Sequence, residues 1–296
     1  MHMKNNPLTN QKIFAWRWDI DHLFDLERGV PSILDVARKH KIRCSFYINL
    51  GRSVDLVEWL YRSPRKTFAK ATSATSINIL KKIGAGEILK ALFWQRQVGR
   101  ARPDILKRIL AEGHELGVHG IFNHLEWSRR LGELSLEYLD DQMDQTLDFF
   151  EKELHFRPIG FTAPGFRYTR DSLLAIDRHF SYSGELFTEE PVAVEIAGKR
   201  LAHMQIPVTV CGPDTIPLIE YLAATGKTSA QIAEHVKHEI DARSFAVPYG
   251  HPGYEGLQTG LLDEIFDHVL RQGFEVLTLA EIYDRYKSYD LATRTV

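Results

Sequence analysis

Short apolar segments alternate with longer amphipathic segments along most of the 296-residue chain. The short segments have the length of buried strands and the longer ones carry apolar residues at helical spacing, so the pattern predicts strand–helix units. Strands are predicted at 13–18, 43–49, 115–118, 160–163, 182–184, 205–210, 245–249 and 274–277. Helices are predicted at 30–40, 103–110, 134–154, 229–241, 261–272 and 279–286.

These elements make about seven strand–helix units, and no linker rich in Pro, Gly or Ser separates them. We therefore expect an α/β fold with one domain spanning 1–296, a distorted (β/α)7-type barrel with a helical insertion. An open, doubly wound sheet is the alternative, because a sequence does not reveal the order of its strands.

One stretch, at about 51–102, interrupts the alternation and is too long for an ordinary strand–helix loop. Its part at 62–102 holds ten basic residues and one acid, Glu87, with Phe93 and Trp94 among the interleaved apolar residues. This segment can be a helical flap with a solvated basic face. It can also be a platform that contacts anionic phosphates or an anionic membrane.

Composition narrows the class of protein only slightly. Apolar residues make up 44% of the chain, charged residues 26%, and the net charge is −2, which is typical of globular proteins and gives no case for a nucleic-acid partner. Cys44 and Cys211 are too few for a disulfide framework. No run of about 18 apolar residues and no signal-peptide pattern occurs. We expect a cytoplasmic protein, peripheral to the inner face of the membrane if the basic segment binds lipid.

Two carboxylates end the first predicted strand. Asp19 and Asp21 follow its apolar residues, at the end where barrel enzymes place their chemistry. Carboxylates so close to an apolar strand need a cation or hydrogen-bond donors. A metal site would use both, one as a ligand and one to take a proton from water. The alternative is that they only cap the following helix.

Two histidines follow the third predicted strand. His119 and His124 lie five residues apart in a stretch whose glycines let the backbone turn. Two imidazoles and a carboxylate make a common open metal site. With 13 histidines in the chain, such a pair also arises by chance. His114 precedes the strand, so we expect it at the opposite end of the fold.

His251 follows another apolar strand, at 245–249, in a loop shaped by proline and glycine. Imidazole titrates near neutral pH, so a histidine in this place can act as a general acid. Taken alone, the segment is also consistent with an ordinary loop histidine.

In order and context these three segments resemble the polysaccharide deacetylase (NodB-homology) superfamily, which has a strand-end aspartate pair, a His-rich motif and a later catalytic histidine. The chain is most similar to the branch that deformylates undecaprenyl-phosphate-linked 4-deoxy-4-formamido-L-arabinose. The segments that carry this likeness are Asp19-Ile20-Asp21, Gly29-Val30-Pro31, Leu92-Phe93-Trp94, Gly113-His114-Glu115, Gly165-Phe166-Arg167 and Gln205-Ile206-Pro207. The resemblance covers nearly the whole chain.

The resemblance implies a hydrolase that removes a formyl or acetyl group from a sugar nitrogen, with a sugar or glycolipid as substrate. Asp19 would be the general base, His251 the general acid, and Arg167 would orient Asp19 or bind substrate. One divalent metal ion, Zn²⁺ first and Mn, Co, Fe or Ni as alternatives, would be held by Asp21, His119 and His124. The implied substrate-binding residues are Trp127, Glu185, Tyr254 and Glu255.

The sequence departs from the family pattern in three places. His119 and His124 are five residues apart where the family has four, which one inserted residue reconciles. Thr162 stands where most deacetylases have an arginine, and Glu185 stands where an aspartate is expected. Two other functions therefore stay open: a non-catalytic glycan-binding relative, and a metal-independent hydrolase of cyclic amides such as allantoin.

Overall fold

The computed structural model describes residues 11–51, 97–122 and 124–296. The strands in these ranges are β1 (Ile13–Phe14), β2 (Arg17–Ile20), β3 (Ser45–Ile48), β4 (Glu115–His119), β5 (Gly160–Thr162), β6 (Tyr182–Ser183), β7 (Val192–Ile196), β8 (Lys199–Gln205), β9 (Phe245–Ala246), β10 (Tyr249–Gly250), β11 (Glu275–Val276) and β12 (Thr293–Thr295). The longer helices are α1 (Val30–His40), α6 (Pro103–Ala111), α8 (Leu136–Phe149), α9 (Arg170–His179), α11 (Ser229–Asp241), α13 (Thr259–Arg271) and α14 (Leu279–Tyr286). Shorter helical segments are η1 (Asp25–Gly29), α5 (Val98–Ala101), α7 (His124–Arg130), η2 (Leu131–Glu133), η3 (Phe150–Leu154), η4 (Pro164–Phe166), η5 (Pro213–Thr215), α10 (Leu218–Ala224) and α12 (Pro252–Glu255).

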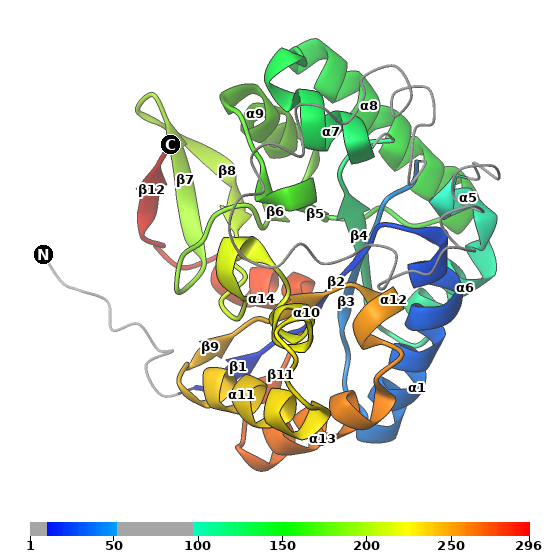
Figure 1. Cartoon of the computed structure of the whole chain (residues 1–296). Coiled ribbons are helices and arrows are strands. Elements are labelled where there is room, and N and C mark those ends of the chain that lie inside the picture. Colours follow the sequence, from blue (N-terminus) through cyan, green and yellow to red (C-terminus); the bar gives the residue numbers. More distant parts are fainter. Residues whose placement is uncertain (1–10, 52–96, 123) are drawn as a thin grey trace, which may run out of the picture.

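The described strands form two hydrogen-bonded sheets. The larger has the order β10-β2-β3-β4-β5-β6-β8-β7-β12, and its neighbours are parallel except for β7 and β8. In the smaller sheet, β1 lies between β11 and β9. Figure 1 shows the parallel strands in the middle of the molecule, with α1, α6, α8 and α9 outside them and β7 and β12 standing to one side. The α/β class is confirmed, whereas this topology does not confirm a closed barrel.

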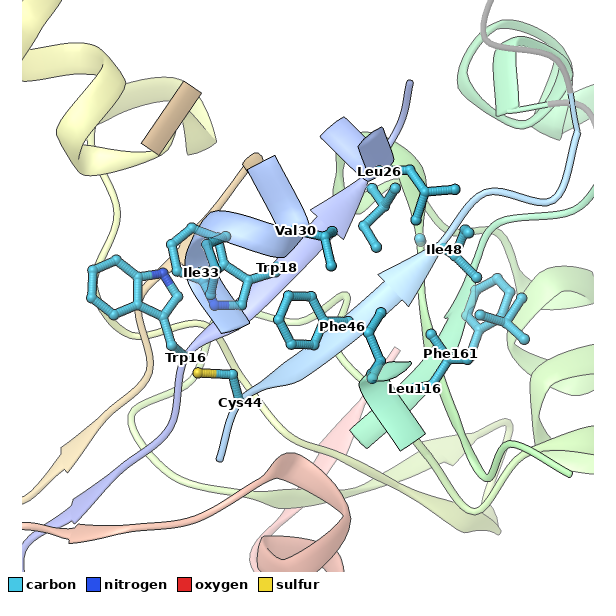
Figure 2. Packing of buried hydrophobic residues seen from close by; sticks show 14 of the residues in the cluster. Trp16, Trp18, Leu26, Val30, Ile33, Cys44, Phe46, Ile48, Leu116 and Phe161 are labelled. Atoms are coloured by element: carbon cyan, nitrogen blue, oxygen red, sulfur yellow. The ribbon is translucent and has the colours of Figure 1, made fainter. Parts of the chain in front are cut away.

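Along the consecutive strands β1 and β2, successive side chains point to opposite sides of the chain, as the pleat of a strand requires. Phe14, Trp16 and Trp18 join the cluster that includes residues of the helices, and the two indole rings stack with centroids 4.8 Å apart. Figure 2 shows Trp16 and Trp18 packed beside side chains of α1 and β3. The intervening Arg17 and Asp19 are buried as well. The strand thus places two charged side chains on its other face, inside the protein.

Three predicted helices, α1, α11 and α14, are confirmed to the residue. The strand predicted at 205–210 is wrong, because β8 ends where that strand was expected to begin. Pro207 has no N–H to donate to a ladder, so strand pairing does not continue through it. The polar start of β8 instead pairs antiparallel with β7.

The basic segment lies mostly outside the described residues, which include only Gly51 and residues 97–102 of the predicted insertion. In that part, α5 is helical. Helical structure in the remainder and a membrane contact through 62–102 stay predictions. In the part of the chain that the structure describes, no helix is both long and apolar enough to cross a membrane.

Candidate metal and catalytic site

The sheet brings the three predicted motifs to one edge. β2 carries Asp19 near its carboxyl end, with Asp21 just beyond it, and β4 ends at His119. β3 lies between these strands and is parallel to both. β10 pairs with β2 on the other side and leads directly into His251. Because the carboxyl ends of parallel strands share an edge, these residues collect there although they are far apart in sequence.

Asp21, His119 and His124 form a compact group. Nε2 of His119 lies 3.1 Å from Oδ1 of Asp21, and Nε2 of His124 lies 3.3 Å from the same oxygen. Each residue offers one ligand atom within 4.8 Å of the others. In a tetrahedral site with bonds of about 2.0–2.1 Å, neighbouring ligand atoms are about 3.3 Å apart. The spacing therefore suits a small divalent cation, and the five-residue separation of the histidines does not keep them apart.

The electrostatics of Asp21 also suit a cation. Its Oδ1 is buried and has no hydrogen-bond partner among the described residues. Burial opposes ionisation of Asp21, but the imidazoles of His124 and His119 outweigh it, so the pKa of this carboxyl lies well below its usual range. A buried carboxylate oxygen that faces imidazole nitrogens is well placed to bind a cation together with them.

Thr162 orients the His119 ring. Its Oγ1 lies 2.7 Å from Nδ1 of His119 and donates to Oδ1 of Asp19 at 3.4 Å. The Thr162 hydroxyl directs its own proton at Asp19, so it accepts a hydrogen bond from Nδ1–H of His119. Nε2 of His119 then carries a lone pair, which faces Asp21. Metal-ligating histidines are commonly fixed in this way through the other ring nitrogen.

Arg17 holds the predicted base, Asp19. Its Nε donates to Oδ1 of Asp19 at 2.9 Å and its Nη2 donates to Oδ2 at 2.7 Å, while Nη1 donates to the carbonyl of Gly184 at 2.9 Å. Burial alone would raise the pKa of Asp19, but Arg17 and His119 reverse this and keep it below its usual value. Asp19 is therefore an ionised carboxylate in the interior, beside the ligand group.

His251 faces the ligand group from the other side. Its Nε2 lies 3.5 Å from Oδ2 of Asp21, and its Nδ1 lies 2.7 Å from Oε1 of the buried Glu220 on α10. A carboxylate on Nδ1 fixes the orientation of the ring. The arrangement gives His251 one nitrogen held by Glu220 and one directed into the site.

Arg167 does not contact Asp19. Its side chain is exposed, and Nη1 donates to the carbonyl of Ser128. Its own carbonyl accepts a hydrogen bond from Nε1 of Trp127 at 3.0 Å. The orienting contact expected of Arg167 is made by Arg17, and a substrate contact by Arg167 stays a prediction. Trp127 has 0% exposure and supports this loop, and a substrate contact by Trp127 stays a prediction.

The other predicted substrate residues occupy different environments. Glu185 is buried, with Oε2 accepting from Nε2 of Gln205 at 2.8 Å, and its Oε1 has no hydrogen-bond partner among the described residues. Oε2 of the buried Glu255 accepts the backbone N–H of His251 at 2.8 Å, so this residue shapes the His251 loop. Tyr254 is half-buried against the main core. Substrate contacts by Glu185, Tyr254 and Glu255 stay predictions, and the burial of Glu255 argues for its structural place.

His114 lies away from this group, as expected from its position before β4. Its Nδ1 accepts the backbone N–H of Cys44 at 3.0 Å, and its ring packs edge-on against Phe46. Burial lowers its pKa to about 4. It is a neutral core histidine with a structural contact.

Arg17 and Glu220 contact the predicted site and were missed from the sequence. Arg17 carried a usable signal, since a charge two positions before Asp19 in an apolar strand shares the face of that aspartate. Glu220 carried none, because it lies on a helix 31 residues before His251 and is one of 39 acidic residues in the chain.

The family profile described as polysaccharide deacetylase matches residues 9–180, more than half of the chain. The chain belongs to the polysaccharide deacetylase family. It is also 23% identical over 278 residues to a protein of Shewanella sediminis (strain HAW-EB3), described as a probable 4-deoxy-4-formamido-L-arabinose-phosphoundecaprenol deformylase ArnD. That match covers 90% of this chain and 85% of the relative.

Solved structures of other proteins show the same fold. A Mycobacterium smegmatis protein described as a polysaccharide deacetylase superposes with a TM-score of 0.67 at 14% identity, over 97% of this chain and 95% of the other. A protein described as a CE4 family pseudoenzyme from Bacillus anthracis superposes with a TM-score of 0.55 at 15% identity, over 97% of this chain and 70% of the other. At these identities the likeness shows the fold alone.

Proposed function

We propose that this polysaccharide deacetylase is a metal-dependent hydrolase that removes an N-formyl or N-acetyl group from a sugar. The observation that carries the proposal is the buried Oδ1 of Asp21, which faces the Nε2 atoms of His119 and His124 at 3.1 and 3.3 Å. Beside it are an ionised carboxylate, Asp19, and an oriented imidazole, His251. Metal-dependent amide hydrolysis uses a cation, a base and an acid in this arrangement.

In the proposed mechanism, two different residues carry out the two proton transfers. Asp19, kept ionised by Arg17, takes a proton from the attacking water. His251, held through Nδ1 by Glu220, gives a proton from Nε2 to the departing amine. A divalent cation held by Asp21, His119 and His124 would polarise the acyl oxygen and acidify the water. Asp19 must be deprotonated while His251 is protonated, so the rate should depend on pH as a bell-shaped curve.

The acyl group and the sugar are a finer proposal. The Shewanella relative is described as a deformylase of a lipid-linked formamido sugar, and we extend formyl removal to this chain as the first candidate, with acetyl as the second. The ten basic residues at 62–102 favour a phosphate-bearing or lipid-linked substrate over a neutral glycan. Under this proposal the enzyme works at the inner face of the membrane.

The test is release of formate and acetate from N-formylated and N-acetylated sugars by the purified protein, with and without a chelator. Chelator-sensitive release of either acid supports the proposal. Release that survives complete metal removal would favour a metal-independent hydrolase of cyclic amides. Binding of glycan with no release at saturating metal would favour a non-catalytic relative, the class in which the Bacillus anthracis neighbour is described.

Membrane contact is tested separately by co-sedimentation with vesicles of anionic and of neutral lipid. We expect binding to anionic vesicles that falls with added salt and weakens when Lys81 and Lys82 are replaced by glutamate. Equal behaviour of the variant and the parent protein would remove the lipid-platform proposal and leave the solvated flap. This outcome would not affect the chemistry proposed for the site.

A further inference from the structure

We propose that Asp25 is a positioning residue that sets the separation between the Asp21 loop and the His251 loop. The inference rests on the proposed function, because that separation matters if both residues act on one substrate. Asp25 opens η1 and is 4% exposed. It belongs to none of the motifs that carry the family resemblance.

The two oxygens of Asp25 bind different loops. Oδ2 accepts the backbone N–H groups of Asp21 at 3.1 Å and of His22 at 2.8 Å. Oδ1 accepts the backbone N–H of Gly253 at 2.9 Å, across 228 positions of sequence. One rigid carboxylate therefore joins the backbone of a proposed metal ligand to the backbone just after the proposed acid.

The packing around these bonds leaves no room for the loops to approach more closely. A Cβ built on Gly253 would lie 2.4 Å from Oδ1 of Asp25, and one built on Gly29 would lie 2.0 Å from the carbonyl carbon of Pro252. The glycines allow η1 and α12 to touch backbone to backbone. Backbone contact sets the shortest distance between the two loops, and the hydrogen bonds of Asp25 set the longest.

The distance between the two loops also sets the distance between the side chains that they carry. Oδ2 of Asp21 and Nε2 of His251 are 3.5 Å apart across the site. Loss of the carboxylate would leave three backbone N–H groups without this acceptor, and either loop could then move. A displacement of about 1 Å at a reacting group can cost roughly 100-fold in rate.

The test compares Asp25→Ala and Asp25→Asn with the control Thr228→Ala. Asparagine keeps the shape of the side chain, but its NH₂ group would face backbone N–H groups of one loop, so that loop loses its acceptor. Thr228 also accepts a backbone N–H, from Gln231, but at the start of α11. The control therefore removes the same kind of contact at a different place. Melting temperatures of all variants show whether each is folded.

Two readouts do not depend on activity. Zn²⁺ affinity, measured by titration of metal-free protein, should fall roughly 10-fold in both Asp25 variants, as for other residues that support metal ligands. The ring resonance of His251, assigned by its loss in His251→Ala, should shift in the metal-free Asp25 variants. Thr228→Ala should change neither. Unchanged Zn²⁺ affinity together with an unchanged His251 resonance would overturn the inference.

The kinetic readout is a double-mutant cycle on the release assay. Asp25→Ala should lower kcat roughly 10- to 100-fold with little change in KM. In a His251→Ala background the same substitution should lower kcat much less, because Asp25 acts partly through His251. Equal losses in both backgrounds would contradict a positioning role. If the parent protein releases no acyl group at all, the proposed function fails, whereas the resonance and the Zn²⁺ affinity still decide the role of Asp25.

Discussion

Arg17 and Asp19 are joined by two parallel hydrogen bonds, of 2.9 and 2.7 Å, and both side chains are almost fully buried. The pair lies two residues apart on one strand, so both side chains share a face of β2. A buried guanidinium that binds both carboxylate oxygens fixes their position as well as their charge. This pair supplies the contact that the sequence suggested for Arg167.

Replacement of Arg17 should therefore impair both folding and turnover. Removal of one partner leaves a buried charge unpaired, so Arg17→Ala should cost about 3–5 kcal/mol in the free energy of unfolding. Without the guanidinium the pKa of Asp19 rises, so the acid limb of the pH–rate profile should move to higher pH. Arg17→Lys should keep part of the stability and regain little turnover, because an ammonium group does not bind both oxygens in the same way.

The matched control for this prediction is Arg285→Ala. Arg285 also binds both oxygens of a carboxylate, that of Glu275, but at the surface. Exposed pairs contribute about 0–1 kcal/mol, so this variant should be nearly as stable as the parent and fully active. Similar losses in the two variants, measured by urea unfolding and by kcat, would show that burial of the Arg17 pair has no special importance.

Variants of the proposed base and of the proposed metal ligands should differ in metal content. Asp19→Asn should retain one bound divalent ion per chain and lose turnover, because the amide cannot take the proton of water. His119→Ala should lose both the ion and turnover, because it removes one of three ligands. Elemental analysis of the purified variants checks both. Full metal content in His119→Ala would contradict the ligand assignment.

Glu220 should act through His251. Glu220→Gln keeps the size of the side chain but removes the charge of the carboxylate that binds Nδ1 of His251. We expect kcat to fall roughly 100-fold with a small change in KM, since an oriented imidazole depends strongly on its carboxylate partner. Steady-state kinetics at saturating metal measure this. An equal loss of metal would instead place Glu220 among the determinants of ion binding.

His114 should make the free energy of unfolding depend on pH, for a reason unrelated to catalysis. Its folded-state pKa of about 4 lies below the value of about 6.5 expected when unfolded. Between these values the unfolded chain binds more protons, so stability is present above pH 6.5 and is lost as the pH falls. The contribution lost between pH 7 and pH 5 is about 2 kcal/mol.

Urea unfolding at both pH values measures this contribution. His114→Asn keeps an acceptor for the backbone N–H of Cys44 but does not titrate, so its stability should change less with pH than that of the parent. The exposed His155 provides the control variant His155→Asn. Equal pH dependence of the parent and His114→Asn would show that His114 does not govern this loss.

The sequence predicted those parts of the fold that local periodicity determines. α1, α11 and α14 were placed to the residue because each has an unbroken apolar stripe between clear boundaries. The strand at 205–210 was misplaced because apolar residues on both sides of Pro207 imitate a strand that the missing N–H does not allow. The antiparallel pair β7 and β8 was missed, since its pattern is irregular and its partner choice is non-local.

For the site, residues at strand ends could be predicted and their supporting contacts could not. Asp21, His119 and His124 come together because strands joined by helices run parallel, so residues that follow these strands collect at one edge of the sheet. Glu220, and the bond from Asp25 to Gly253, depend on how distant segments pack in the whole molecule. No spacing rule connects these residues with the distant groups that they hold. Trp127 was assigned to substrate from a motif position; its burial shows a supporting contact that the motif did not predict, and the substrate contact stays untested.

Metal-dependent removal of an N-acyl group is tested most directly by one reconstitution series. Metal-free protein, the same protein with one equivalent of Zn²⁺, and His119→Ala with Zn²⁺ are each incubated with N-formylated and N-acetylated sugars, and released formate and acetate are measured. We predict release only from the reconstituted parent protein. Equal release from the metal-free protein, or no release from the reconstituted protein with any N-acyl sugar, would contradict the proposed function.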